Sequence, residues 1–173
     1  MNTELIESAK EMAWEKHKSE VERMTDRLGK EIDEGIKETV IALRAIGFPT
    51  SQSCEGHTVR GLPYPWVDIT APTECTLWWS APTPGYEKRQ ELANLKLEQR
   101  MVELLAEFYE NRQTPFDARL SFVFIRKAFR VQSIGGRTLS LLSPEEKEMK
   151  IGIYKKEMED FARFLKQKYF SSP

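Results

Sequence analysis

The sequence predicts an α+β (or α/β) fold in which helices cover a small β-sheet, with a long helical region at each end of the chain. Apolar residues recur at helical spacing over residues 2–46 and 143–170, and the first segment contains no proline. Between them, residues 66–70, 118–125 and 129–134 alternate as strands do. The 173 residues, 40% hydrophobic and 31% charged, suit one globular domain with a helical appendage.

The N-terminal region, residues 1–46, is predicted to form two helices, because Gly29 and Gly35 interrupt a composition that favours helix. Gly47 and Pro49 end the second helix. The apolar stripes need a partner, so we expect them either to pack on the sheet or to meet in a homodimer. The stripe residues are Leu5, Ala9, Met12 or Ala13, Val21, Met24 and Leu28, followed by Ile32, Ile36, Val40, Leu43 and Ile46.

The central region, residues 47–142, is predicted to begin with loops and to continue as an α/β core. Six of the nine prolines fall within residues 48–85, where only residues 66–70 and 76–79 are expected to be strands. A helix is expected over residues 86–111, and two strands follow it. Its predicted buried face consists of Leu92, Leu95, Val102, Leu105, Phe108 and Tyr109.

The C-terminal region, residues 143–173, is predicted to be a helix that packs on the core. Ser143 stands at the N-cap, Pro144 at the first helical position and Glu146 three residues after the cap, which is the pattern of a capping box. The residues expected to point inward are Met149, Ile153, Met158, Phe161 and Leu165.

Composition narrows the possible partners and location. The formal net charge is −1, and proteins that bind the phosphate backbone in bulk usually carry excess positive charge, so bulk nucleic acid is not expected as a partner. No apolar run approaches the roughly 20 residues of a membrane span. The N-terminus lacks the apolar segment of a secretory signal, and the chain has two cysteines, so we expect a cytoplasmic protein without disulfides.

The segment TSQSCEGH, residues 50–57, is predicted to be a ligand-binding loop between a helix and a strand. Gly56 permits close approach of a ligand to the backbone, and successive N–H groups in such a turn can bind an anion. Thr50 and Ser53 add hydroxyl groups. His57 can bind a phosphate or exchange a proton near neutral pH, and Cys54 is either a nucleophile or a small buried side chain.

Aromatic and charged residues outside this loop complete the predicted site. Trp66 and Trp78 offer flat faces for a base, or else fill a small core. Asp68 alternates with apolar neighbours and is expected to face solvent or the site, where its carboxylate would accept a ribose hydroxyl. Arg130 would bind an anionic group, or else protect a strand edge. It belongs to a basic stretch of Arg119, Arg126, Lys127, Arg130 and Arg137, in which Asp117 is the one acid.

A zinc site is a further alternative, built from Cys54, His57, Cys75 and Asp68. The spacing of these residues matches no common zinc motif, and the chain has no C-x-x-C. We therefore predict no metal site from the sequence.

Two short segments resemble the tRNA wybutosine-synthesis methyltransferase family. Residues 50–57 resemble its loop T-T-S-S-C-S-G-R, and residues 129–134 are similar to its segment G-F-R-N-S-G-I. The resemblance implies an S-adenosylmethionine-dependent N-methyltransferase acting on a hypermodified guanosine of tRNA, with His57 or Asp68 taking the proton. His57 replaces an arginine of the family motif, and Glu55 replaces a serine. The matching residues are Thr50, Ser53, Cys54, Gly56, Phe129, Arg130 and Ser133.

Three functions remain open on this evidence. The first is a small-molecule binding protein that holds a nucleotide-type ligand around residues 53–57, to sense or sequester it. The second is a methyltransferase-like enzyme acting on RNA, or an enzyme with Cys54 as nucleophile and His57 as base. The third is a structural or adaptor protein that assembles through its long helices.

Overall fold

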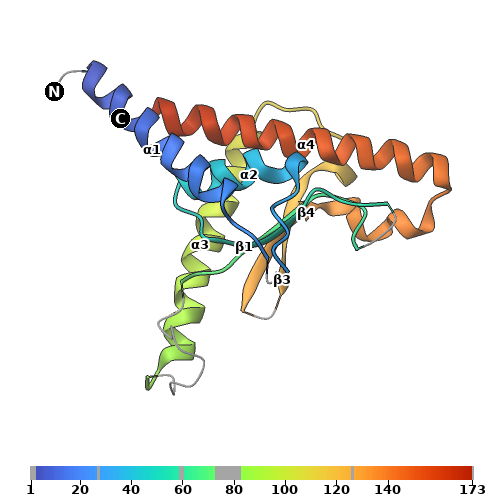
Figure 1. Cartoon of the computed structure of the whole chain (residues 1–173). Helices are drawn as coiled ribbons and strands as arrows, with labels where there is room; N and C mark the ends of the chain where they lie inside the picture. The colour runs from blue at the N-terminus through green and yellow to red at the C-terminus, as the bar shows by residue number, and fades with distance from the viewer. Residues whose placement is uncertain (1–2, 27, 59–60, 73–82, 126, 173) are drawn as a thin grey trace.

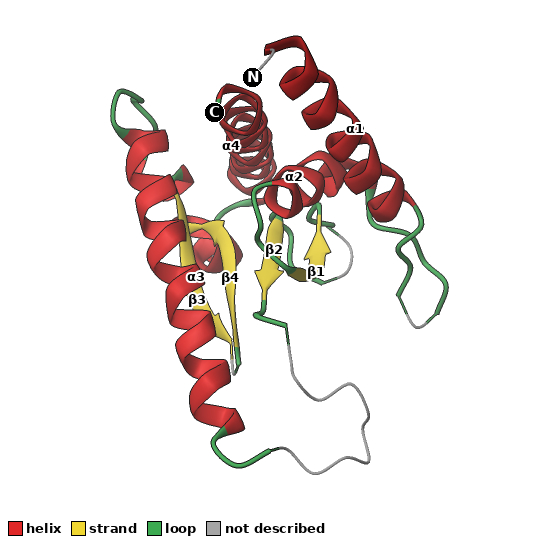
Figure 2. Ribbon diagram, turned by 90° about the vertical axis from the view of Figure 1, so that its left-hand side faces the viewer, coloured by secondary structure: helices red, strands yellow, loops and turns green. Residues whose placement is uncertain are grey.

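The protein has a mixed α+β fold built on one four-stranded antiparallel sheet with the strand order β1-β2-β4-β3 (Figure 2). The computed structural model describes residues 3–26, 28–58, 61–72, 83–125 and 127–172. The four α-helices of these residues are α1 (Thr3–Glu22), α2 (Glu34–Ala45), α3 (Tyr86–Tyr109) and α4 (Pro144–Ser171). The strands are β1 (Thr50–Cys54), β2 (Trp66–Ile69), β3 (Leu120–Ile125) and β4 (Ala128–Ser133), and two 3₁₀ helices are η1 (Phe116–Ala118) and η2 (Ile134–Leu141). The predicted fold class is confirmed.

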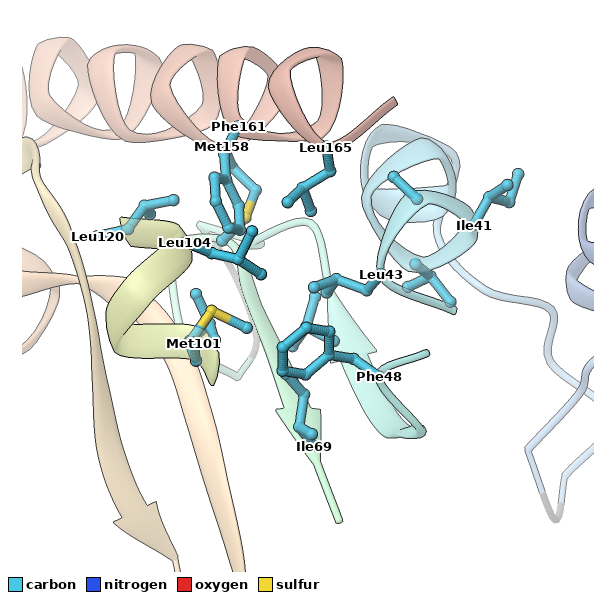
Figure 3. Packing of buried hydrophobic residues seen from close by; sticks show 14 of the residues in the cluster. Ile41, Leu43, Phe48, Ile69, Met101, Leu104, Leu120, Met158, Phe161 and Leu165 are labelled. Atoms are coloured by element: carbon cyan, nitrogen blue, oxygen red, sulfur yellow. The ribbon is translucent and has the colours of Figure 1, made fainter. Parts of the chain in front are cut away.

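Helices α2, α3 and α4 cover one face of the sheet and form the main core with it (Figure 3). Alternation in the strands points Val67 and Ile69 of β2, and Phe129 and Val131 of β4, toward these helices, and all four are fully buried. The remaining large side chains of this core come from the helices and from the segment after α2. They include Ile36, Leu43, Phe48, Met101, Phe108, Phe161 and Leu165.

Helix α1 packs within the same chain, against α2 and the end of α4 (Figure 1). The ring of Trp14 is 4% exposed and lies 5.6 Å from Tyr169 and 5.5 Å from Phe170, measured between ring centroids. The hydroxyl of Tyr169 donates to the backbone oxygen of Lys10 at 3.2 Å. The helices thus pack within the chain, but α1 packs on α2 and α4 rather than on the sheet as the first alternative expected, and a homodimer stays a prediction.

Residues 23–26 and 28–33 separate α1 from α2 and include a turn. The carboxylate of Asp26 accepts hydrogen bonds from the backbone N–H groups of Leu28 (2.8 Å) and Lys30 (2.9 Å), which offers the backbone an alternative to helix. Gly29 follows with a φ of +77°. The predicted break is confirmed at Gly29, whereas Gly35 lies inside α2 and does not interrupt it. Met12 and Leu28 are 66% and 92% exposed and do not belong to the buried stripes.

Residues 50–54 form an edge strand, and their prediction as a loop was wrong. The sequence TSQSC lacks apolar alternation because β1 pairs on one side only, with β2, and is partly exposed. Its register shifts between Thr50 and Gln52.

The buried face of α3 also differs from the prediction. Leu92, Leu95 and Val102 are 51–54% exposed. Two amides occupy the buried side near the start of the helix: Asn94 accepts from the N–H of Ala71 (2.8 Å), and Gln90 donates to the oxygen of Ala71 (2.7 Å). These bonds satisfy the backbone groups of Ala71, just after β2. The side of α3 that is buried near its start is therefore the side that carries Gln90 and Asn94. The buried residues are Gln90, Asn94, Leu97, Met101, Leu104, Leu105 and Phe108.

Helix α4 begins as predicted. The hydroxyl of Ser143 accepts from the N–H of Glu146, whose carboxylate accepts from the N–H of Ser143 at 3.0 Å. Met149 was expected to point inward but is 59% exposed, because the buried face begins at Ile151. Among the described helices, none combines the length and apolar character needed to cross a bilayer. The strand expected at residues 76–79 lies outside the described residues, as do Trp78 and Cys75.

Candidate functional site

The sheet face opposite the helical core carries most of the polar strand residues. Antiparallel pairing places Asp68 beside Arg130 and Trp66 beside Gln132 on this face. Because side chains alternate along a strand, these four point away from the core formed with α2, α3 and α4.

Asp68 and Arg130 bind each other. Arg130 Nε lies 2.6 Å from Asp68 Oδ1 and its terminal nitrogen 2.9 Å from Oδ2, a bidentate ion pair, and Asp68 is 6% exposed. The guanidinium carbon also lies 3.6 Å from the ring centroid of Trp66. Asp68 thus lies on the face away from the helical core, as expected, but it is buried against Arg130 rather than exposed to solvent. Both carboxylate oxygens and one face of the indole are occupied by Arg130.

A pocket of about 500 Å³ opens beside this pair, between the sheet, residues 62–64 and η2. Three cationic side chains line it: Arg130, Arg137 and Lys147. No Asp or Glu is among the described residues of its lining. Tyr64, Gln132 and Ser140 add polar groups, and the apolar wall consists of Leu62, Val123, Ile125 and Leu139.

Tyr64 lines this pocket and packs on the backbone of η2. Its ring is 3% exposed and packs so closely on Gly136 that a Cβ there would lie 2.9–3.0 Å from the ring. Burial raises the pKa of Tyr64, although the charges of Arg130 and Arg137 act in the opposite direction. The phenol therefore stays neutral near pH 7, and the cations of the pocket are not offset by it.

The turn at Gly56 is packed by protein rather than left open for a ligand. Gly56 has a φ of +85°, and a Cβ at this position would lie 2.7–2.9 Å from backbone atoms of Pro63 and Tyr64. The N–H of His57 donates to the oxygen of Leu62 at 3.2 Å. The glycine is thus required by its conformation and by a close approach of two backbone segments.

Cys54 and His57 meet a residue that sequence spacing did not indicate, Asp33 from the segment before α2. His57 Nε2 lies 3.0 Å from Asp33 Oδ2, and one ligand-type atom of each of Asp33, Cys54 and His57 lies within 4.8 Å of the others. All three residues are partly buried. Such a set of carboxylate, thiol and imidazole could hold a metal ion.

The pKa values of Asp33 and Cys54 are shifted in opposite directions. Burial alone would raise the pKa of Asp33, but hydrogen bonds from Lys30, His57 and the N–H of Glu55 outweigh it and lower the pKa to about 2. Burial raises the pKa of the Cys54 thiol. Without a metal or another activating group, Cys54 is therefore protonated near neutral pH, which disfavours its role as a free nucleophile.

The remaining predicted site residues, Thr50, Ser53 and Ser133, lie in different parts of the structure. Thr50 and Ser53 line a second, polar hollow of about 310 Å³ between β1 and residues 24–33, which Trp66 also reaches. Ser133 is fully buried at the end of β4. The structure thus separates residues that the sequence treated as one site. The sequence did not indicate Asp33 because its partners Cys54 and His57 lie 21 or more residues away. It did not indicate Lys147 because Arg130 and Arg137, which line the same pocket, belong to other elements.

Comparisons with protein-family models, with curated proteins and with solved structures find no match for this chain.

Proposed function

We propose that the protein binds a small anionic molecule of the nucleotide class in the pocket lined by Arg130, Arg137 and Lys147. The observation that carries the proposal is the convergence of three cations, without a carboxylate among the described lining residues, on one hollow of about 500 Å³. Pockets for small organic ligands have about this size and combine an apolar wall with a few polar groups.

The individual cations suit different parts of such a ligand. Arg130 is already neutralised in part by Asp68, so it offers its remaining N–H groups rather than a full charge. Among the described residues, no carboxylate pairs with Arg137 or Lys147. These two side chains would bind the phosphate or carboxylate group, and the wall of Val123, Ile125 and Leu139 would contact the organic part.

This pocket is favoured over the turn at residues 53–57 as the anion site. The space beside Gly56 is filled by the backbone of Tyr64, and the N–H of Gly56 points to Cys54 Sγ at 3.4 Å. His57 is held by Asp33. These groups are engaged within the protein and are not free to bind a phosphate.

The proposal is tested by mass spectrometry of small molecules released on denaturation, followed by titration of adenine and guanine nucleotides into the folded protein. Arg137→Gln and Lys147→Gln should each weaken binding about tenfold or more, because a hydrogen bond to a charged group contributes roughly 1.5–3 kcal/mol. Calorimetry or equilibrium dialysis measures the change in Kd.

Lys156→Gln is the matched control, since Lys156 is also on α4 but pairs with Asp160 away from the pocket. Its affinity should equal that of the parent. Equal affinity of Arg137→Gln and the parent, or no binding of any nucleotide, would refute the proposal. Release of an S-adenosyl compound would instead point to the methyltransferase-like alternative.

A further inference from the structure

We propose that Asp33, Cys54 and His57 form a binding site for a transition-metal ion of the zinc type. This site is independent of the nucleotide pocket, because none of the three residues lines that pocket. It joins the segment before α2 to the end of β1 and the turn that follows.

The geometry of the three side chains is the first support. Each offers one ligand atom, and the three atoms lie within 4.8 Å of one another. A tetrahedral zinc ion with bonds of about 2.0–2.3 Å has ligand atoms separated by roughly 3.3–3.8 Å, so small side-chain movements bring the set to that geometry. Gly56, in its left-handed conformation, makes the turn that brings Cys54 and His57 to the same point.

The groups around the three candidate ligands are the second support. Asp33 Oδ1 is held by Lys30 Nζ at 2.6 Å, which leaves Oδ2 directed toward His57 and the site. On the other side of the imidazole, Glu55 Oε1 lies 3.9 Å from His57 Nδ1, so a small movement of Glu55 would bring it within hydrogen-bond distance. A carboxylate behind a histidine is the usual outer partner of a metal-binding imidazole, because it fixes the tautomer and the ring orientation.

Two backbone groups complete this arrangement. The N–H of Gly35 donates to Glu55 Oε2 at 2.8 Å and thereby holds the carboxylate behind His57. The N–H of Gly56 points to Cys54 Sγ at 3.4 Å, where it would stabilise the thiolate that a metal requires. Asp33 and Cys54 therefore each have a second group that orients them, and the carboxylate of Glu55 stands near the other nitrogen of His57.

The chemistry of the ligands selects the class of ion. Thiolate and imidazole together favour zinc over magnesium or calcium, which prefer oxygen ligands. Three protein ligands leave a fourth position for water or a substrate atom, which is the pattern of catalytic rather than structural zinc sites. On binding, the ion replaces the proton of the Cys54 thiol and the hydrogen bond between His57 and Asp33.

Cobalt(II) is the probe that tests the site, because a cobalt–thiolate bond gives a near-ultraviolet charge-transfer band. The full chain, freed of metal with a chelator, is titrated with cobalt and then with zinc. We expect the band at one equivalent, and its loss when zinc displaces cobalt. Cys54→Ser should abolish the band, and His57→Asn and Asp33→Asn should each weaken binding at least about tenfold.

The chain supplies its own matched controls, since it has two cysteines and two histidines. Cys75→Ser and His17→Asn remove the other member of each pair and should leave the band and the affinity unchanged. A parent protein that folds but gives no band, or a band that survives in Cys54→Ser and disappears in Cys75→Ser, overturns the proposal.

A second measurement uses the parent protein only, so it does not depend on the folding of variants. Zinc should slow alkylation of Cys54 by about tenfold or more, while leaving the rate at Cys75 unchanged, because a metal-bound thiolate is shielded from the reagent. Peptide mass spectrometry follows each cysteine separately. Equal rates at Cys54 with and without zinc show that the cluster is a hydrogen-bonded contact between loops rather than a metal site.

Discussion

At the scale of single residues, the ion pair of Asp68 and Arg130 decides what the open face of the sheet can bind. A free arginine beside a tryptophan would be available to an anionic ligand and a base. Here the side chains of Asp68 and Arg130 are only 8% and 16% exposed, and Arg130 covers one face of Trp66. The pair fixes the guanidinium at the border of the cationic pocket and leaves Arg137 and Lys147 to provide the uncompensated charge.

Asp68→Asn should lower the free energy of unfolding by roughly 2–4 kcal/mol, because removal of one partner leaves the other charge largely buried and unpaired. Urea denaturation followed by tryptophan fluorescence measures the change. Glu107→Gln is the matched control, since Glu107 pairs with Lys168 where both side chains are well exposed, and it should cost at most about 1 kcal/mol. A loss for Asp68→Asn no larger than that of the control would contradict the assigned role of the pair.

At the scale of elements, the sequence predicts those whose apolar periodicity matches their burial. Helices α2 and α4 and strands β2 and β4 follow this rule, and their bounds, like those of β3, lie close to the predicted ones. It fails for β1, where one unpaired edge permits a polar sequence, and for α3, where Asn94 binds backbone groups beside the sheet. In both, backbone hydrogen bonds that only the folded structure reveals override the hydrophobic pattern.

In the candidate metal site, too, the sequence indicates some residues and only the fold reveals the other. Cys54, Gly56 and His57 stand out in the sequence as one short motif, and the structure places Cys54 and His57 together. Asp33 does not stand out, because it lies in a charged stretch 21 residues before Cys54. Its proximity arises from the pairing of β1 with the sheet and the position of α2 beside it, which no local pattern encodes.

Gly56→Ala should destabilise the turn between β1 and residues 62–64 by about 3 kcal/mol or more. The substitution adds the strain of a positive φ, roughly 1–2 kcal/mol, to a clash with the backbone of Pro63 and Tyr64. Gly29→Ala has a similar φ of +77° but meets no atom within 4 Å, so it should show the strain alone. Thermal unfolding of both variants separates the two contributions, and equal losses would argue against the close approach at Gly56.

At the scale of the whole molecule, the two faces of the sheet differ in what covers them and in the side chains that they carry. One face carries the main core and is closed by α2, α3 and α4. The opposite face holds the ion pair and the cationic pocket, bordered by η2 and residues 62–64. A smaller cluster of Tyr64, Ala118, Leu139, Ile151 and Tyr154 ties η2 to the first half of α4. Tyr64 and Leu139 belong both to this cluster and to the pocket lining, so the wall of the pocket is anchored in a buried cluster apart from the main core.

Trp14→Ala should detach α1 from the rest of the fold and cost roughly 3–5 kcal/mol, because the ring is almost fully buried against Tyr169 and Phe170. Hydrogen exchange should show lost protection in α1, while β2 and β4 keep theirs. Met12→Ala is the control on the same helix, and its 66% exposure predicts a change within about 0.5 kcal/mol. Unchanged exchange in α1 of Trp14→Ala would show that other contacts hold the helix.

The contact between α1 and the end of α4 also sets an order of events during synthesis. Trp14 leaves the ribosome early, yet its aromatic partners Tyr169 and Phe170 are added about 155 residues later in the chain. Until then α1 can pack on α2, which follows it directly in the chain, but the Trp14 ring lacks the aromatic side chains that bury it in the folded protein. The packing of α1 is therefore complete only after the end of α4 has been synthesised, although α1 precedes α4 in the chain.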